Sequence, residues 1–539
     1  MTTAPTGSRK RQNILVAAIL ALALAAAGCT TIGSSASEAA AAGTELAAAA
    51  EAAPASERTT TADSSEVANS ENAVAAMIEN QESHASAEDL VYDKAGVGMI
   101  SLNGTTATSA AGGVAVSGST ITITAAGVYS LSGTLSDGEV IVDATDTADV
   151  TLLLDGADIT NSDGSAIAVM NADEVVVVLM EGTTNTLTDG VTYAFADAET
   201  DEPNATLYSS ADLTIAGDGE LVVTANSNDG ITSKDGLVIE AGTISVDAVD
   251  DGIRGKDYVI INGGDVDVVA GGDGIKADND EDVDRGYVLI AAGTVDVTSG
   301  DDGVQAATDA LITGGTVTIQ AGATSSTEES GRAIQGDVMV VVSGGTIFAD
   351  AGDDAIHSNS TVTIDGGDLT LSSGDDGIHG DFFVTIDGGS ILITESFEGI
   401  ESEVITITDG SIDLTATDDG LNVADGTAAE TNTPTVGGGP GRGGGGETAG
   451  DYYIYISGGT TIITIRSSSQ ADGDGIDSNG SVVMTGGVVV VNGPTDSRNS
   501  ALDYNGSFEV SGGLLIGTNI DGMMSEGVGE GSTQASLYL

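Results

Sequence analysis

The chain has 539 residues, and its composition excludes several classes of protein before any motif is considered. It carries 83 Asp and Glu residues against 14 Lys and Arg residues, and the formal net charge of −69 disfavours binding to nucleic acid or to an anionic lipid surface. The 77 glycines form no strict triplets, which excludes collagen. Glycine and β-branched residues, with only 6 prolines and no tryptophan, indicate many short strands joined by tight turns.

Residues 1–28 have the pattern of a secretion signal. Residues 9–11 are basic, and residues 14–27 form an apolar run that is too short to span a membrane comfortably. The run ends in Ala-Ala-Gly-Cys at Cys29, which is similar to the lipobox of bacterial lipoproteins. We therefore expect an exported, extracytoplasmic, cell-surface lipoprotein with lipid on Cys29; the alternative is cleavage near Ala27, which leaves a free thiol. Cys29 is the only cysteine, so no internal disulfide can form.

The rest of the chain divides by composition. Residues 29–95 are rich in Ala, Ser, Glu and Thr and predict a disordered, low-complexity tether, because they offer almost no large apolar side chains for a core. Residues 96–525 read as short strands, interrupted by a Gly-rich loop insertion over 425–451. Residues 526–539 form a tail that is either a loose end or a cap.

A repeat of 22 residues runs through the strand-rich region, as in DDGIRGKDYVIINGGDVDVVAG (250–271) and DDGIHGDFFVTIDGGSILITES (375–396). Six of the ten steps between successive aliphatic residues of the repeat are 21 or 22 residues, and the longest steps contain visible insertions. These aliphatic residues are Ile231, Ile253, Ile275, Val304, Ile334, Ile356, Ile378, Ile400, Leu421, Ile476 and Leu502.

The repeat predicts an all-β fold, a right-handed single-stranded parallel β-helix. Each unit contains three short strands in which apolar and polar residues alternate, as one buried face requires. About 22 residues in three strands make one coil of such a solenoid. The eleven aligned coils then rise roughly 50 Å at about 4.8 Å each, and residues 114–227 add three or four less regular coils.

An acidic turn precedes each aliphatic position, and we predict that these turns hold calcium. Because the period equals one coil, the carboxylates stack about 4.8 Å apart, where two unit charges repel by roughly 1 kcal/mol in water and 3–4 kcal/mol at an effective dielectric of 20. Calcium takes six to eight oxygen ligands and relieves this repulsion. The alternative is turn chemistry alone, with the charge screened by solvent. The expected ligands are Asp250, Asp251, Asp273, Asp301, Asp302, Asp353, Asp354, Asp375, Asp376, Asp418, Asp419 and Asp474; the coil with Arg332 lacks the acidic pair.

The few basic residues gather in neighbouring coils beside the acidic turns. We expect ligand contacts from two kinds of side chain here, cations and aromatic platforms; the alternatives are pairing with nearby Asp and packing within strands. The expected contacts are Arg254, Lys256, Lys276, Arg285, Tyr258 and Tyr287. His357 and His379 lie one coil apart, and we expect an outward, exposed pair rather than a metal site.

The segments EGIES (398–402), DGDGIDSNG (472–480), NGPT (492–495) and ALDY (501–504) resemble one known family. It is the bacterial secreted carbohydrate-binding domain family, whose members are calcium-containing, pectate-lyase-like parallel β-helices. The likeness runs from about residue 128 to 525. The resemblance implies binding of plant cell-wall polysaccharides, acidic pectin-like chains among them, without catalysis.

Together these observations favour calcium-dependent capture of an acidic, polyuronate-like polysaccharide by a protein that is not an enzyme. We expect a monomer that contacts membrane only through its N-terminal lipid anchor and does not bind nucleic acid. Two alternatives remain open. One is a polysaccharide lyase that uses calcium and a Lys or Arg base. The other is a structural surface spacer or adhesin.

Overall fold

The computed structural model describes residues 73–86, 91, 96–195, 201–322, 331–424, 449–466, 473–495, 499–519 and 526–537. The predicted signal, Cys29 and most of the predicted tether lie outside these residues, as does all but the end of the Gly-rich insertion. No helix within the described ranges is long and apolar enough to cross a membrane.

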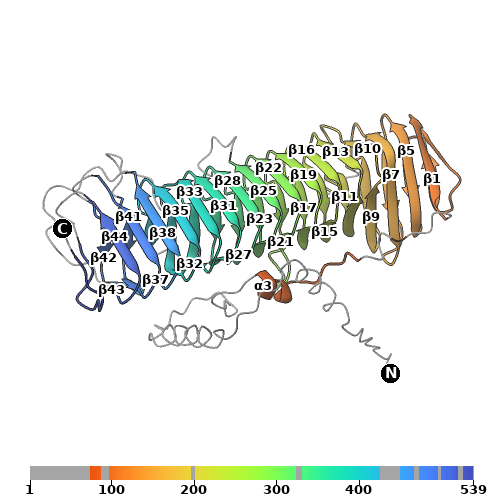
Figure 1. Cartoon of the computed structure of the whole chain (residues 1–539). Helices are drawn as coiled ribbons and strands as arrows, with labels where there is room; N and C mark the ends of the chain where they lie inside the picture. The colour runs from red at the N-terminus through yellow and green to blue at the C-terminus, as the bar shows by residue number, and fades with distance from the viewer. Residues whose placement is uncertain are drawn as a thin grey trace, which may run out of the picture. The chain divides into compact units, whose positions relative to one another are not determined.

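From Gly98 onward the described residues form a parallel β-solenoid of about 14 turns (Figure 1), which confirms the predicted fold class. Each complete coil contributes to three faces, and strands on the same face of neighbouring coils pair in parallel. Two hairpins near the N-terminal end, β1 with β2 and β3 with β4, are the antiparallel pairs among the described strands.

Face one follows the acidic turn of each coil and consists of β4 (Thr120–Ile123), β6 (Glu139–Asp143), β8 (Ile167–Asn171), β11 (Ala205–Ser209), β14 (Asp229–Ser233), β17 (Ile253–Gly255), β20 (Ile275–Ala277), β23 (Val304–Ala306), β26 (Ile334–Gly336), β29 (Ile356–Ser358), β36 (Leu421–Val423), β39 (Ile476–Ser478) and β42 (Leu502–Tyr504). Face two comes next and consists of β9 (Glu174–Leu179), β12 (Asp212–Gly217), β15 (Gly236–Ile239), β18 (Tyr258–Ile261), β21 (Tyr287–Ile290), β24 (Asp309–Ile312), β27 (Met339–Val342), β30 (Thr361–Ile364), β37 (Tyr453–Ile456), β40 (Ser481–Met484) and β43 (Phe508–Val510).

Face three completes the coil and consists of β10 (Thr184–Thr188), β13 (Glu220–Ala225), β16 (Thr243–Ala248), β19 (Asp265–Ala270), β22 (Thr294–Ser299), β25 (Thr316–Ala321), β28 (Thr346–Ala351), β31 (Asp368–Ser373), β33 (Ser390–Glu395), β35 (Ser411–Ala416), β38 (Thr460–Ile465), β41 (Val488–Asn492) and β44 (Leu514–Thr518). Longer strands turn from one face into the next: β1 (Gly98–Gly104), β5 (Gly127–Leu135), β7 (Asp149–Thr160), β32 (Ile378–Ile386) and β34 (Ile400–Ile407). The remaining strands are β2 (Ala107–Ser109) and β3 (Val114–Ser117).

The predicted aliphatic positions stack into a continuous buried ladder on face one. Each of the eleven residues pairs in register with the next, from Ile231 to Leu502, and none is more than 6% exposed. A glycine turn between faces two and three keeps this register, as at Gly389, whose φ of 81° is a conformation that other residues rarely adopt. The 22-residue spacing therefore measures one coil, as predicted.

The outside of face two is also apolar over several coils, and residues 73–86 cover it. Ala76 of α3 (Ala73–Glu79) is buried in this second cluster, and Asn80 Nδ2 donates a 3.0 Å hydrogen bond to Asp309 Oδ2. Figure 1 shows α3 beside β21. Residues 73–86 fall within the stretch expected to be a tether, but they pack instead, because covering an exposed apolar strip lowers the free energy of the folded protein.

Residues 526–537 of the expected tail lie along the last coil. Gly529 N–H donates to Phe508 O at 2.7 Å, and Thr533 N–H donates to Val510 O at 3.1 Å. These bonds satisfy part of the open edge of β43, so this part of the tail acts as a cap.

Candidate functional site

The candidate site is the corner at which each coil passes from face three to face one. The residues two positions before nine of the eleven aliphatic ladder residues form an inner acidic column: Asp229, Asp251, Asp273, Asp302, Asp354, Asp376, Glu398, Asp419 and Asp474. One position earlier stand the outer acidic residues: Asp250, Asp301, Asp353, Asp375 and Asp418. The expected calcium ligands thus divide into two sets with different surroundings.

The inner acidic column has a structural role in addition to its charge. One carboxylate oxygen accepts the backbone N–H of the equivalent residue one coil later, as in Asp273 N–H to Asp251 Oδ1 at 3.0 Å and Asp376 N–H to Asp354 Oδ1 at 2.9 Å. Except for the partly exposed Asp302, the inner residues are buried. The backbone N–H of the next coil is therefore the partner of one carboxylate oxygen of these Asp residues, while the second oxygen still needs a partner.

That second oxygen looks toward a facing column, the residues one position after the aliphatic ladder. In chain order they are Thr232, Arg254, Lys276, Gln305, Gln335, His357, His379, Glu401, Asn422, Asp477 and Asp503, each paired in register with the next. The column is basic at the N-terminal side, neutral and then imidazole-bearing in the middle, and acidic at the C-terminal side.

In the N-terminal coils, lysine and arginine side chains neutralise the inner column. Lys276 Nζ lies 2.6 Å from Asp273 Oδ2 and 3.4 Å from Asp251 Oδ2. Burial opposes the charge of Lys276, but the carboxylates of Asp273 and Asp251 outweigh it and raise the pKa of its ammonium. Arg254 Nη1 lies 3.5 Å from Asp229 Oδ2, so two of the expected ligand-contacting residues are engaged with the corner itself.

The other expected basic contacts lie nearby. Arg285 Nη1 pairs with Asp257 Oδ2 at 2.7 Å, and Lys256 is partly exposed. In the coil that lacks an acidic pair, Arg332 takes the inner position and its Nε lies 3.4 Å from Asp353 Oδ2. This arginine replaces a negative charge of the inner column by a positive one.

In the C-terminal coils no basic residue of the facing column compensates the carboxylates. Asp419, Asp474 and Asp477 bring ligand oxygens within 4.8 Å of one another. Burial, together with the neighbouring carboxylate of Asp503, raises the pKa of Asp474 to about 7 and that of Asp477 to about 6. Burial and the charges of Asp477 and Glu398 raise the pKa of Asp419 well above its ordinary value. These directions mean that the ionised carboxylates are crowded and that no counter-charge among the described residues offsets them.

Asn422 points to a ligand at this end of the corner. Its side chain is 6% exposed, and its Nδ2 donates to Glu398 Oε2 at 2.9 Å. Its Oδ1 is buried and accepts no hydrogen bond from the described residues. An amide oxygen beside several carboxylate oxygens is a donor set of the kind that calcium prefers, so the residues fit that ion.

Two further acidic groups meet the same distance criterion. Asp353, Asp354 and Asp375 form one, and Asp273, Asp301 and Asp302 form the other. Burial, reinforced by the charge of Asp354, raises the pKa of Asp375 to about 7, and its Oδ1 is buried without a hydrogen-bond partner among the described residues. Four of the expected ligands belong to none of these three acidic groups: Asp250, Asp251, Asp376 and Asp418. Asp376 directly follows Asp375, and Asp418 directly precedes Asp419.

The expected exposed histidine pair is instead enclosed. His357 is 6% exposed, its ring stacks on that of His379 with centroids 4.9 Å apart, and carboxylates of the inner column lie against both rings. Asp354 and Asp376 lie three residues before these histidines in the same repeats, and the following coil adds Glu401, whose Oε2 lies 3.2 Å from His379 Nδ1. This last contact is not visible in any single repeat.

Tyr258 and Tyr287 are fully buried and do not form an exposed platform in this structure. Their rings stack at 5.2 Å, and residues 73–86 cover them: His84 Nδ1 lies 2.8 Å from the Tyr258 hydroxyl, and the Tyr287 hydroxyl donates to Gln81 O at 2.8 Å. They therefore anchor the covering segment.

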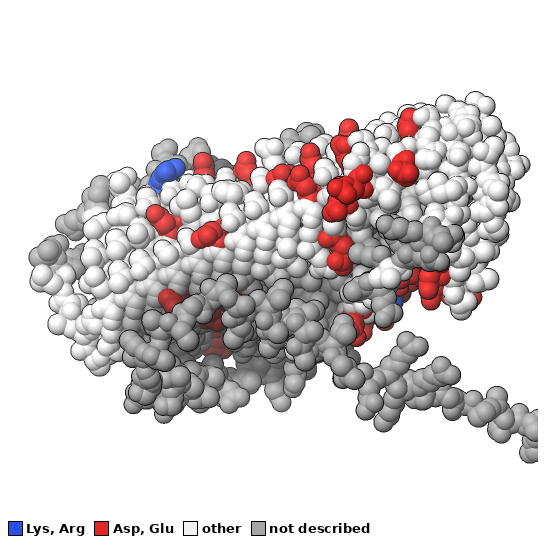
Figure 2. Space-filling view, turned by 45° about the vertical axis from the view of Figure 1, so that its right-hand side comes forward, with Lys and Arg blue, Asp and Glu red and all other residues white. Residues whose placement is uncertain are grey.

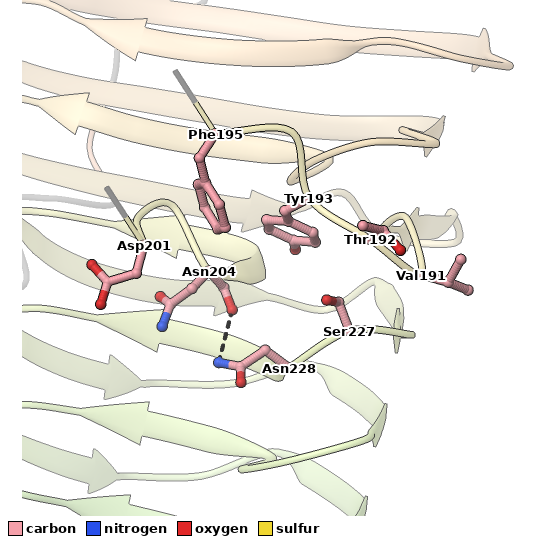
Figure 3. A pocket seen from close by; sticks show the side chains of 8 residues that line it. All are labelled: Val191, Thr192, Tyr193, Phe195, Asp201, Asn204, Ser227 and Asn228. Carbon is pink, nitrogen blue, oxygen red and sulfur yellow. Dashed lines mark hydrogen bonds between the residues drawn. The ribbon is translucent and has the colours of Figure 1, made fainter. Parts of the chain in front are cut away.

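An aromatic depression lies at the N-terminal end of the same corner (Figure 3). It has a volume of about 480 Å³ and is lined by Val191, Thr192, Tyr193, Phe195, Asp201, Asn204, Ser227 and Asn228. Tyr193 and Phe195 have ring centroids 5.9 Å apart, and Phe195 is 40% exposed. Asn228 directly precedes Asp229, the first residue of the inner acidic column. This site was not predicted from the sequence, although Tyr193 and Phe195, separated by one residue in an acidic loop, were a usable signal.

Figure 2 shows many more acidic than basic side chains on the face in view. With a net charge of −69, the protein repels an anionic polymer at long range unless cations lie between them. Any recognition of an acidic ligand must therefore be local and cation-assisted.

The fold and this corner define a class of protein: a parallel β-solenoid with a stacked acidic corner. Residues 117–377 match the model of the family described as "Carbohydrate-binding domain-containing protein", the family that the sequence resembles.

Two known proteins are similar to parts of the chain. A carbohydrate-binding domain-containing protein of Acetivibrio thermocellus is 39% identical over 121 residues, which are 22% of this chain and 42% of that protein. The chain thus matches less than half the length of that relative. The solved structure of a polysaccharide lyase-like protein from C. thermocellum, a gadolinium derivative, is 34% identical, with a TM-score of 0.39 over 50% of this chain and 96% of that one.

Proposed function

We propose that this chain is a non-catalytic cell-surface protein that binds an acidic polysaccharide through calcium held at the acidic corner. One observation carries the proposal: the inner column stays acidic in the C-terminal coils, where the facing column no longer supplies a cation. The match of residues 117–377 to a carbohydrate-binding family supports the proposal independently of the site.

The C-terminal coils are the best candidates for calcium. Asp419, Asp474 and Asp477 would supply carboxylate oxygens, and the buried Oδ1 of Asn422 would supply an amide oxygen. Calcium at this place supplies positive charge and takes six to eight oxygens, more than the protein side chains offer, so positions remain for an external carboxylate. A uronate group is such a carboxylate, which links the ion to the glycan.

A glycan lying along the corner would meet a sequence of complementary groups. The Tyr193 and Phe195 rings stand at one end and suit the apolar face of a sugar ring. Arg254 and Lys276 follow, each about a quarter exposed and able to add a contact to an anionic polymer while paired with Asp. The calcium-bearing coils come last.

The lyase alternative has less support. A general base must be deprotonated to accept a proton, whereas Lys276 lies against two carboxylates that raise the pKa of its ammonium. Arg254 is held by Asp229, Asp251 and Asp278, and burial is outweighed by these charges, so the pKa of its guanidinium is raised too. Both side chains therefore act as cations rather than as bases.

The test is retention of the chain on immobilised polygalacturonate, with calcium and with chelator. We expect calcium-dependent retention that the pair Asp474→Asn and Asp477→Asn weakens and that Phe195→Ala reduces separately. Asp368→Asn, which removes an exposed charge on face three, is the matched control. Ultraviolet-absorbing unsaturated products would establish the lyase instead. Absence of retention on any acidic polysaccharide would leave the spacer.

The cell-surface location is part of the proposal and rests on the signal and Cys29. Growth with labelled fatty acid should label the wild-type chain in the expressing bacterium. Cys29→Ala should abolish the label and release the chain into the medium. Label retained by that variant would contradict lipidation at Cys29.

A further inference from the structure

The enclosed histidine pair is the part of the corner that calcium does not explain. Calcium prefers hard oxygen ligands, whereas an imidazole nitrogen suits zinc and other late first-row metals. At this place the facing column changes from the cations of the N-terminal coils to the carboxylates of the C-terminal ones, through His357 and His379. Asp354, Asp376 and Glu401 surround the two rings.

Each Nε2 has an oxygen atom that can accept a proton from it, and a ring that carries its proton on Nε2 can bind a metal through Nδ1. His357 Nε2 lies 2.9 Å from Asn359 Oδ1, and Asn359 is oriented by its own Nδ2, which donates to Asp337 Oδ1 at 3.1 Å. His379 Nε2 lies 3.3 Å from Asp381 Oδ1, which can only accept when ionised. Both Nδ1 atoms lie against the inner column, that of His357 at 2.7 Å from Asp354 Oδ2 and that of His379 at 2.8 Å from Asp376 Oδ2.

At His379 the Nδ1 atom faces two carboxylates together. Asp376 Oδ2 lies at 2.8 Å and Glu401 Oε2 at 3.2 Å. A lone pair against two ionised carboxylates is repulsive, and a single N–H cannot be aligned with both acceptors. With Asp381, three carboxylates lie against one ring, so even a protonated imidazole leaves a net negative charge in a buried place. A divalent ion removes both difficulties.

The spacing of the donors fits such an ion. Zinc–nitrogen and zinc–oxygen bonds of about 2.0–2.2 Å place neighbouring ligand atoms roughly 3.0–3.5 Å apart. The separations of 2.8 and 3.2 Å from Nδ1 are close to this range, and all three ligand atoms lie within 4.8 Å of one another. The side chains are buried, with 12% of His379, 5% of Asp376 and 3% of Glu401 exposed.

We propose that Asp376, His379 and Glu401 form a binding site for a zinc-like divalent transition metal, distinct from the calcium positions of the corner. Asp354 and His357, 2.7 Å apart through Oδ2 and Nδ1, are the adjoining pair one coil earlier. The site ties β32 to β34 across neighbouring coils. Its occupancy does not depend on glycan binding or on calcium.

The experiment uses the full chain, stripped of metals and then saturated with calcium so that all-oxygen sites are filled. Equilibrium dialysis then measures retained zinc, and cobalt absorption reports nitrogen ligation. We expect at least one tightly retained ion per chain. Loss of a direct ligand in His379→Gln should weaken binding by at least about tenfold, and Glu401→Gln should also weaken it. His84→Gln is the matched control, because the chain has only 3 histidines and His84 lies on face two.

Nuclear magnetic resonance of the wild-type chain gives a second readout that needs no variant. Zinc should shift the ring signals of His379 and His357 and leave that of His84 unchanged. The proposal is overturned if the calcium-saturated chain retains no zinc, which would mean that protons alone balance the rings. It is equally overturned if a folded His379→Gln variant binds zinc as the wild type does.

Discussion

In the absence of calcium, neutralising one carboxylate of the acidic corner should stabilise the protein. Asp474 is the suitable position, because its Oδ1 accepts the backbone N–H of Ser500 and an asparagine can keep that bond while it removes the charge. Burial and the charges of Asp503 and Asp477 raise the pKa of Asp474 to about 7, from an ordinary value of 3.8. Asp474→Asn should therefore relieve repulsion without breaking the ladder.

The size of the effect follows from the pKa of Asp474. A rise of roughly three pH units corresponds to about 4 kcal/mol once the carboxyl is fully ionised, and screening by solvent and salt reduces this to ~2 kcal/mol. The folded-state pKa of Asp474 lies above its unfolded-state pKa. The part of the unfolding free energy that depends on its protonation is therefore fully present below about pH 4 and is lost as the pH rises through 7. With an unfolding entropy of about 2.1 cal/mol/K per residue, ~2 kcal/mol shifts the Tm of a solenoid this long by roughly 2 °C.

The assay is thermal unfolding in chelator at acidic and at alkaline pH. We expect Asp474→Asn to melt above the wild type at alkaline pH and together with it near pH 4. In calcium the order should reverse, because the variant lacks a ligand. Asp368→Asn, with the same change of charge on an exposed strand position, should change neither result. A variant that melts below the wild type in chelator at alkaline pH would refute the claim of uncompensated charge.

Three further outcomes follow from the described contacts. Ile356→Ala should destabilise the solenoid by about 2–5 kcal/mol in denaturant unfolding, whereas Val249→Ala, at a 59% exposed position, should have little effect. Lys276→Gln should create an additional calcium-binding equivalent in calorimetry, because Asp251 and Asp273 lose their cation; an unchanged stoichiometry would contradict this. Tyr258→Phe, which removes the hydroxyl that contacts His84, should increase protease cleavage near residues 73–86 without altering the β-strand signal in circular dichroism.

The solenoid could be predicted from the sequence because its cause is local and repeated. The period of 22 residues places aliphatic residues such as Ile253 and Ile275 over one another, and the pairing register follows directly. The division of each acidic pair could not be predicted in the same way. Asp353 and Asp354 are chemically identical in the sequence, and what distinguishes the inner residue is the hydrogen bond that Asp376 N–H of the next coil donates to Asp354 Oδ1.

Contacts over long sequence distances explain the remaining differences. Tyr258 was expected to face a ligand, but the side chain of His84, 174 positions earlier, packs on it. His379 was expected to be exposed, but Glu401 from the following coil lies against its ring. The repeat period predicts how often a residue type recurs along the chain. It does not predict which residues from other parts of the chain contact a given side chain.

The facing column gives the corner a direction along the solenoid axis. Where the facing column carries Arg254 and Lys276, the protein's own side chains supply the positive charge, whatever ions the solution holds. Where it carries Asp477 and Asp503, positive charge would have to come from ions in solution. Because a solenoid is stabilised mainly by contacts between neighbouring coils, a change in ion concentration acts on the coils that bind the ion and spreads only to their neighbours. If the C-terminal coils bind calcium as proposed, the same stacked turns would provide a rigid N-terminal segment and an ion-responsive C-terminal one, and a bridged glycan would be held and released at the latter.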